Sequence, residues 1–166
     1  MLVIETERLL IQKFALEDAP FIFTLLNDPS FIKNIRYAGI KTIADAENYL
    51  KNVPLKSYEQ HGHGLYKVAL KVNNISIGMC GLIKRESLSD VDIGYAFLPE
   101  YTGKGYAIEA AKATIDYGKT SLNLKRIVAI TSPDNEASIK VLLKLGMKFE
   151  GFVKTNPDDI DLKLFA

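Results

Sequence analysis

The sequence predicts a mixed α/β fold, in which a largely antiparallel sheet of about six to seven strands carries helices on both faces. Two patterns along the 166-residue chain support this class. The first half contains strand-like runs separated by tight turns, which is typical of antiparallel hairpins. The second half alternates strand-like runs with helical stripes, which is typical of β-α-β units. Both kinds of strand pairing should therefore occur in one sheet.

The N-terminal third is expected to contain one strand and two helices. Leucine and isoleucine are frequent in Arg8–Phe14, which favours a strand. Acidic residues and a proline at the start of Leu16–Leu26 indicate a helix. Thr42 and Asp45 have the spacing of a capping box, so a second helix should begin after Thr42 and end near 53–54.

The middle of the chain contains three strand-like runs: Tyr66–Val72, Ile75–Lys84 and Val91–Leu98. Asn73 and Asn74 separate the first two runs, and asparagine tolerates the positive φ angles of a tight hairpin. These runs predict an antiparallel hairpin followed by a third strand.

The C-terminal part is predicted to alternate helices and strands. Apolar or small residues recur at helical spacing at Ile108, Ala111, Ile115, Gly118 and Leu122. A short strand is expected at Arg126–Thr131. In the next helix Ile139, Leu142 and Leu143 should share one face, and Gly146 should end it as a left-handed cap. Two final strands are expected at Lys148–Lys154 and Ile160–Phe165.

Composition points to one ordinary globular domain covering residues 1–166, because 48% of the residues are hydrophobic and 25% are charged. The formal net charge of +1 predicts neither a nucleic acid nor a membrane surface as a partner. The first residues lack the pattern of a secretory signal, and Cys80 is the single cysteine. We therefore expect a cytoplasmic protein, either a monomer or a homodimer.

A glycine-rich turn after the Val91–Leu98 run is the most informative segment. Gly103 and Gly105 lack a Cβ atom, so their N–H groups can approach an anion, and the following helix adds further free donors. The turn therefore predicts a pyrophosphate site, although a plain strand-to-helix turn has the same composition. A P-loop is excluded because Lys104 is followed by glycine instead of Ser or Thr, and Ile108 breaks the Rossmann pattern.

Thr102-Gly103-Lys104-Gly105-Tyr106-Ala107, read with the preceding Ile93-Gly94-Tyr95, resembles the acetyl-CoA pyrophosphate loop of the GNAT superfamily of N-acyltransferases. Gly105 and Ala107 fit the family pattern, whereas Thr102 stands where the family has Gln or Arg. Further segments are similar to the RimJ/RimL-like subgroup: Thr6–Ile11, Gly78–Leu82 and Asn135–Gly151. The resemblance thus extends along most of the chain.

The resemblance implies a strongly twisted mixed sheet, splayed between the Val91 and Arg126 strands, with the pantetheine arm of acetyl-CoA in the gap. It implies an acetyl-CoA-dependent N-acetyltransferase, most simply one that modifies a protein N-terminal amine. A small amine (a polyamine, amino acid or antibiotic) is the alternative acceptor, and a non-catalytic acyl-CoA-binding module is the alternative class. The implied cofactor-binding residues are Phe97, Leu98, Thr102, Gly103, Lys104, Gly105, Tyr106, Ala107 and Asn135.

Direct attack of an amine on the thioester needs a base and a proton donor for the departing thiolate. Ser138 is the candidate donor, because it follows the helix-capping Asn135 by three residues and both should face the acyl-CoA. Asp92 is the first candidate base, and Glu86, or a chain of water molecules, is the alternative. A backbone N–H around Phe97 and Leu98 would hold the oxyanion.

Other reactive residue types are interpreted as structural. Cys80 lies in an apolar run, which indicates a buried thiol and not a nucleophile. His61 and His63 are too few ligands for a metal, so no metal is expected, and a flexible loop near the acceptor pocket is predicted there. Four tyrosines are candidates for lining that pocket, with packing the more ordinary role: Tyr37, Tyr58, Tyr66 and Tyr101.

Overall fold

The computed structural model describes residues 1–166. It contains one eight-stranded sheet in the order β1-β2-β3-β4-β5-β6-β8-β7. The strands are β1 (Leu2–Glu5), β2 (Leu9–Gln12), β3 (Leu65–Leu70), β4 (Ser76–Ile83), β5 (Val91–Phe97), β6 (Ile127–Thr131), β7 (Phe149–Val153) and β8 (Leu162–Phe165). Every neighbouring pair is antiparallel except β5 and β6. The predicted mixed, largely antiparallel sheet is confirmed.

The strand that raises the number above the expected six to seven is β1. It spans only four residues and pairs with β2 through an irregular register. A run this short carries too little alternation to be separated from a loop in the sequence. Its pairing with β2 places the turn around Thr6–Arg8 at the edge of the sheet.

The helices are α1 (Ala19–Leu26), α2 (Pro29–Asn34), α3 (Ile43–Leu50), α4 (Lys56–His61), α5 (Tyr106–Thr120) and α6 (Glu136–Lys144), with short 3₁₀ segments η1 (Leu16–Asp18) and η3 (Pro99–Tyr101) and a π-helical segment η2 (Lys51–Leu55). No helix combines the length and apolar character needed to cross a membrane. The capping box is confirmed, because Thr42 Oγ1 accepts from Asp45 N at 3.1 Å and an Asp45 carboxylate oxygen accepts from Thr42 N at 3.0 Å.

The helical region departs from the expectation in three places. The helix after Thr42 does not end near Pro54, because the wider π-helical turn of η2 accommodates the proline and leads directly into α4. Helix α2 was not expected, and it begins at an Asp28 cap followed by Pro29. Leu143 is 55% exposed, whereas Leu142 is buried, since adjacent helical residues point about 100° apart.

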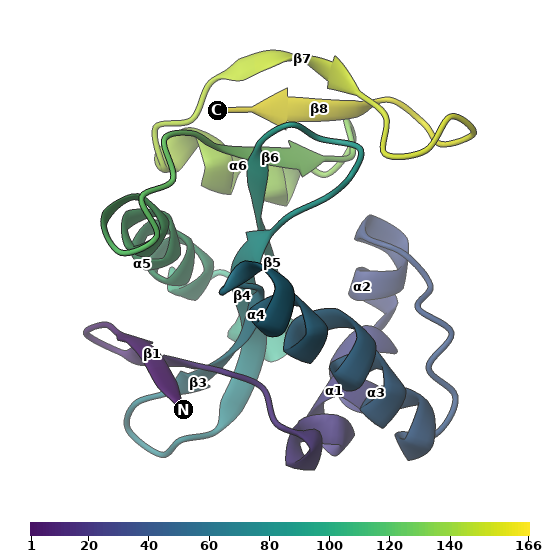
Figure 1. Ribbon diagram of the computed structural model, residues 1–166, viewed down its shortest axis with the longest axis vertical. Helices are drawn as coiled ribbons and strands as arrows, with labels where there is room; N and C mark the ends of the chain where they lie inside the picture. The colour runs from purple at the N-terminus through teal and green to yellow at the C-terminus, as the bar shows by residue number, and fades with distance from the viewer.

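Two apolar cores occupy the two faces of the sheet, as the prediction of helices on both faces requires. One core joins the sheet to α5 and α6 and includes Ala110 and Leu142. The other joins it to α1, α2 and α3 and includes Ile22, Phe31 and Leu50. Figure 1 shows α5 on one side of the central strands and α1–α3 on the other.

The sheet opens between its only two parallel neighbours. β5 and β6 pair only where Val91 faces Ile127 and Asp92 faces Val128. Beyond that point β6 pairs with β8, and Figure 1 shows β6, β8 and β7 together at one end of the molecule while β5 continues away from them. The splay that the resemblance implied between the two strands is therefore present, and it leaves one backbone edge of β5 unpaired.

Candidate active site around the β5–β6 gap

The loop after β5 presents a row of free N–H groups. Gly103 and Gly105 have φ angles of +74° and +83°, and Gly105 is the N-cap of α5, which no side chain caps. The backbone N–H groups of residues 103–108 have no acceptor in the protein. Left-handed φ angles are accessible to glycine at little cost, and unpaired donors at a helix N-terminus favour a bound anion. The loop therefore fits a pyrophosphate.

Two residues predicted to bind the cofactor have their polar groups engaged elsewhere. The N–H and Oγ1 of Thr102 both donate to the carbonyl of Pro99, at 3.1 and 2.7 Å. The N–H of Leu98 donates to Ile77 O at 2.9 Å, across the pairing with β4. The Leu98 N–H is therefore not free to hold an oxyanion. Because successive N–H groups of a strand point to opposite sides, the Phe97 N–H points into the gap instead.

The first turn of α6 brings three polar side chains together. Asn135 Oδ1 accepts from Ser138 N at 3.2 Å and caps the helix, while the Asn135 amide NH₂ has no partner. Ser138 Oγ lies 3.0 Å from the hydroxyl of Tyr95 on β5, and that hydroxyl also donates to Ser138 O at 3.4 Å. Burial raises the pKa of Tyr95 to about 12, with the Ser138 hydrogen bond acting in the opposite direction. Tyr95 is therefore a neutral proton donor at pH 7.

Tyr95 is the residue that sequence reasoning missed. Strand alternation places its side chain on the α5 face with Val91 and Ile93, and this parity is readable from the sequence. The meeting of its hydroxyl with Ser138, 43 positions later, depends on how α6 packs and has no local signal.

Asp92 lies on the opposite face of the sheet from Tyr95 and Ser138. Ala96 packs against the core formed with α1–α3, and alternation places Asp92 on the same face. Its side chain is 1% exposed and one oxygen accepts from Arg85 Nε at 2.9 Å. Burial raises the pKa of Asp92, and the Arg85 guanidinium offsets this only in part. Glu86, the alternative base, is exposed in the turn between β4 and β5.

The remaining candidate residues have structural surroundings. Cys80 is fully buried beside Thr114, with its Sγ 3.5 Å from the threonine Oγ1, and burial raises its thiol pKa to about 12. His63 is buried with Nδ1 2.9 Å from Leu82 O, so the flexible loop expected there is wrong for this residue. The Tyr66 ring is buried and stacks on Tyr58, which donates to Leu65 O.

The fold and the glycine loop define a CoA-dependent acyltransferase, and comparisons with known proteins agree. The family profile described as "Acetyltransferase (GNAT) domain" matches residues 8–148. A Bacillus subtilis protein with the name "Uncharacterized N-acetyltransferase YnaD" is 34% identical over 151 residues, covering 91% of this chain and 85% of the relative. The chain belongs to the GNAT acetyltransferase family and is an N-acetyltransferase that uses acetyl-CoA.

Two further relatives carry specific names. A crystal structure of ribosomal-protein-S5-alanine acetyltransferase from Vibrio fischeri has a TM-score of 0.78 and 27% identity, covering 98% of this chain and 93% of that one. The spermidine N(1)-acetyltransferase of Escherichia coli K12 is 49% identical over 53 residues, which is 32% of this chain and 28% of the relative. The similarity to the first extends over almost the whole chain, and the similarity to the second over about a third.

Proposed function

We propose that this protein is a cytoplasmic N-acetyltransferase that transfers an acetyl group from acetyl-CoA to the N-terminal α-amine of a protein. The observation that carries the proposal is the arrangement around the β5–β6 gap. The free N–H groups at the start of α5 come directly after β5, which forms one side of the gap. The hydroxyl groups of Tyr95 on β5 and Ser138 on α6 lie within hydrogen-bond distance of each other. The first feature suits a pyrophosphate, and the second suits a departing thiolate.

The residues present fit acetyl-CoA. The N–H groups of residues 103–107 would hold the pyrophosphate, and the free Asn135 amide together with the unpaired edge of β5 would hold the pantetheine amides. When bound, acetyl-CoA supplies the thioester carbonyl that an amine attacks. The Phe97 N–H, which points into the gap, is the donor for the oxyanion that forms from this carbonyl.

The acid and the base act from opposite faces of the sheet. Asp92, on the face with α1–α3, receives the proton of the attacking amine through a chain of water molecules, because its side chain is only 1% exposed. Ser138, on the face with α5 and α6, donates its hydroxyl proton to the leaving thiolate. A protein α-amine has an ordinary pKa of about 8, so a carboxylate whose pKa burial has raised is a suitable base at neutral pH.

Tyr95 supports the proton donation by Ser138. Its buried hydroxyl is neutral and lies 3.0 Å from Ser138 Oγ. When Tyr95 donates to Ser138 Oγ, the serine proton turns away from Tyr95 and becomes free to reach the thiolate. Ser138 therefore acts as a proton relay: as its proton passes to the thiolate, the Tyr95 proton passes to Ser138 Oγ, so the serine stays neutral, and the phenolate of Tyr95 regains a proton from solvent.

The surface around α2 and α3 is more suited to a peptide than to a polyamine. Burial raises the pKa of Tyr49 on α3, while Arg36 and Arg85 oppose the shift, which means that both cations lie near the phenol. Arg85 is paired with Asp92, so the charge of Arg36 is the one that would repel a polyamine. The exposed Ile35 and Tyr37, which follow α2, offer apolar surface to a peptide. The similarity to the ribosomal-protein-S5-alanine acetyltransferase over almost the whole chain supports the same choice.

A small amine is the second candidate acceptor, and the local 49% identity with the spermidine acetyltransferase supports it. The assay that separates the candidates is thiol release from acetyl-CoA with N-terminal peptides of ribosomal proteins, with spermidine and with single amino acids. We expect the peptides to have the highest kcat/KM. A higher kcat/KM for spermidine would indicate a small-amine acetyltransferase. If the protein binds CoA but releases no thiol with any of these acceptors, a non-catalytic acyl-CoA-binding module would be favoured.

The order of the two substrates tests the direct attack. Because the buried Cys80 is a poor nucleophile, we expect a ternary complex and intersecting double-reciprocal lines. Parallel lines, together with an acetyl adduct on the protein that Cys80→Ala abolishes, would overturn direct attack and make Cys80 catalytic.

A further inference from the structure

The turn between β1 and β2 is bonded to the start of α5, although about 100 residues separate them in sequence. Glu109, in the first turn of α5, accepts from Thr6 Oγ1 at 2.7 Å and from Arg8 N at 2.9 Å. The Arg8 guanidinium then donates through Nε to the second Glu109 oxygen at 2.7 Å. The N-terminal segment that marked the family resemblance is therefore attached to the helix behind the glycine loop.

Arg8 also contacts the loop itself. Its Nη1 donates to the carbonyl of Lys104 at 3.0 Å, and its guanidinium lies 4.4 Å from the centre of the Tyr106 ring. The Lys104 carbonyl belongs to the same planar peptide as the Gly105 N–H, and in a trans peptide these two groups point in opposite directions. By holding the carbonyl on one side, Arg8 fixes the direction of the Gly105 N–H on the other.

The ion pair also removes an electrostatic penalty. A free Glu109 carboxylate in the first turn of α5 would repel a pyrophosphate bound at the same helix end. Burial by itself raises the pKa of Glu109, but the hydrogen bonds from Thr6 and Arg8 outweigh it and hold that pKa below its ordinary value. Glu109 is thus ionised at neutral pH, and Arg8 balances its charge.

We propose that Arg8 is a positioning residue for the cofactor loop: it holds the Lys104–Gly105 peptide so that its N–H faces the pyrophosphate of CoA, without contacting CoA. This inference rests on the proposed binding of CoA pyrophosphate by residues 103–107. It gives the Thr6–Arg8 turn a role in cofactor affinity in addition to its place in the sheet.

The first test is the affinity of the protein for CoA, measured by calorimetry in Arg8→Met. Loss of one charge-assisted bond and release of the peptide should weaken binding by about tenfold. The side chain is 43% exposed and borders a surface hollow of about 360 Å³, so its shortening leaves no void in the core. Arg8→Lys keeps the charge but cannot reach Lys104 O and Glu109 together, so it should weaken binding about as much.

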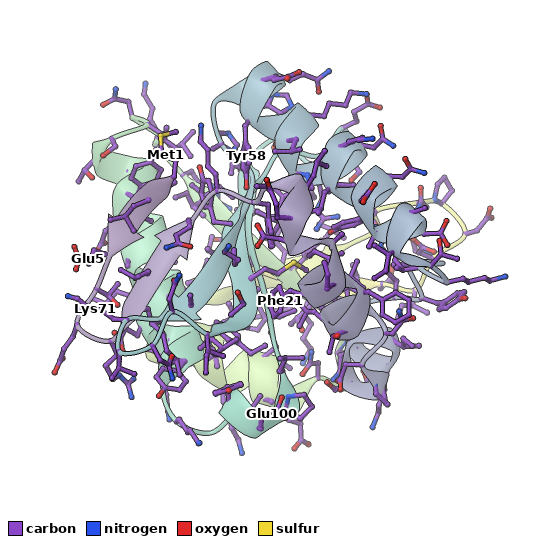
Figure 2. All side chains as sticks on the ribbon, turned by 90° about the horizontal axis from the view of Figure 1, so that it is seen from below. Met1, Glu5, Phe21, Tyr58, Lys71 and Glu100 are labelled. Atoms are coloured by element: carbon purple, nitrogen blue, oxygen red, sulfur yellow. The ribbon has the colours of Figure 1, made fainter.

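The matched control is Lys71→Met. Lys71 forms an ion pair with Glu5 at 2.8 Å and also donates to Thr6 O in the same turn, at a longer 3.3 Å, but it contacts neither Glu109 nor Lys104; Lys71 and Glu5 lie next to each other at the edge of the molecule in Figure 2. Its side chain is 44% exposed, close to the value for Arg8. Lys71→Met should leave the affinity for CoA unchanged, whereas equal losses in the two Met variants would reduce the effect to general charge and overturn the proposal.

A second test replaces acetyl-CoA with S-acetylpantetheine, which lacks the pyrophosphate. Arg8→Met should raise the KM for acetyl-CoA and leave kcat and the use of S-acetylpantetheine as in wild type. An equal fall with both donors would indicate a purely structural role, and recovery of CoA affinity in Arg8→Lys would indicate direct contact with phosphate; either result overturns the proposal. A wild type that binds CoA but transfers no acetyl group would contradict the proposed function alone.

Discussion

Helices α5 and α6 both begin beside the β5–β6 gap, yet their first turns are built in opposite ways. α5 follows Gly105, whose backbone is left-handed and whose missing side chain leaves the first N–H groups open. α6 follows Asn135, whose own side chain accepts the Ser138 N–H. A helix end that caps itself has less capacity for an external anion. The difference supports our proposal that α5 binds the pyrophosphate and that α6 positions one hydroxyl.

The comparison also separates binding from chemistry. The α5 end offers only backbone donors, which do not titrate near neutral pH. The α6 end offers the Ser138 hydroxyl, supported by Tyr95 from the facing strand. Substitutions at α5 should therefore change the affinity for CoA, and substitutions at α6 should change turnover.

The largest effect is expected for Gly105→Val. A β-branched residue is strained at a φ of +83°, so the loop should shift to relieve that strain, and the new Cβ, 3.3 Å from Arg8 Nη2, would also displace the guanidinium slightly. Loss of two hydrogen bonds to a charged phosphate should weaken CoA binding, measured by calorimetry, by about 100-fold or more.

Gly146→Val is the control for this change, since Gly146 has a φ of +85° but lies after α6. Gly146→Val should lower the free energy of unfolding about as much as Gly105→Val does, but leave the affinity for CoA unchanged. Circular dichroism would show that both variants are folded. Wild-type affinity in Gly105→Val would remove the loop from the site.

The next effect is expected for Ser138→Ala. Without the hydroxyl, the thiolate leaves unaided, so kcat should fall by about 10- to 100-fold while the shape of the pH profile stays similar. Tyr95→Phe should lower kcat by a smaller factor, and the double variant should be no slower than Ser138→Ala, because Tyr95 acts through that serine.

The measurement is steady-state kinetics on Ser138→Ala, Tyr95→Phe and the double variant. The control is Ser121→Ala, which changes an exposed serine after α5 and should leave kcat unchanged. A loss of CoA affinity with normal turnover at saturation would reassign Ser138 to cofactor contact. If the effects of Tyr95→Phe and Ser138→Ala on kcat were additive in the double variant, Tyr95 would not act through Ser138.

A smaller effect is expected for Asp92→Asn, of about tenfold in rate at pH 7. With the base removed, the rate should rise with pH toward the pKa of the acceptor amine. Asp90→Asn is the control, because Asp90 also pairs with an arginine, Arg126, but its side chain is 36% exposed. If Asp92→Asn kept the wild-type rate and pH–rate profile, water or another group would have to accept the proton of the amine.

The pH dependence of folding stability in Asp92→Asn tests the raised pKa of Asp92 independently of activity. Since the folded state binds the Asp92 proton more tightly than the unfolded chain does, wild-type stability should decline as the pH rises from about 4 through the raised pKa. This contribution should be absent in Asp92→Asn when urea unfolding is followed across that range. A stability that instead rises with pH at this site would mean that the Arg85 ion pair outweighs burial.

The smallest effect is expected for Asn135→Ala. Loss of the α6 cap should lower the free energy of unfolding by about 1 kcal/mol, measured by urea denaturation. Asn48→Ala, at an exposed position within α3, should cause no loss, since alanine favours a helix. If the free Asn135 amide also binds pantetheine, CoA affinity falls as well, and unchanged affinity would limit Asn135 to its capping role.

Local signals predicted most of the elements and the glycine-rich turn before α5. The capping box at Thr42, the Asn73-Asn74 hairpin and the cap at Gly146 depend on backbone preferences of neighbouring residues, and the structure contains all three. The sequence pattern did not predict β1, because a four-residue strand is too short to show a clear alternation. It also did not predict that the helical region continues through Pro54, because this requires the wider π-helical turn.

The sequence by itself determined the alternation of strands and helices and the glycine loop that opens α5, because period, caps and missing Cβ atoms are properties of nearby residues. Strand pairing decided that the Leu98 N–H donates to Ile77 O, and the packing of the sheet and its helices alone decided that Tyr95 meets Ser138 and that Arg8 reaches Glu109 and Lys104. Each of these last contacts joins residues 43 to 101 positions apart. Such contacts form only when the sheet and its helices pack, so no local pattern encodes them.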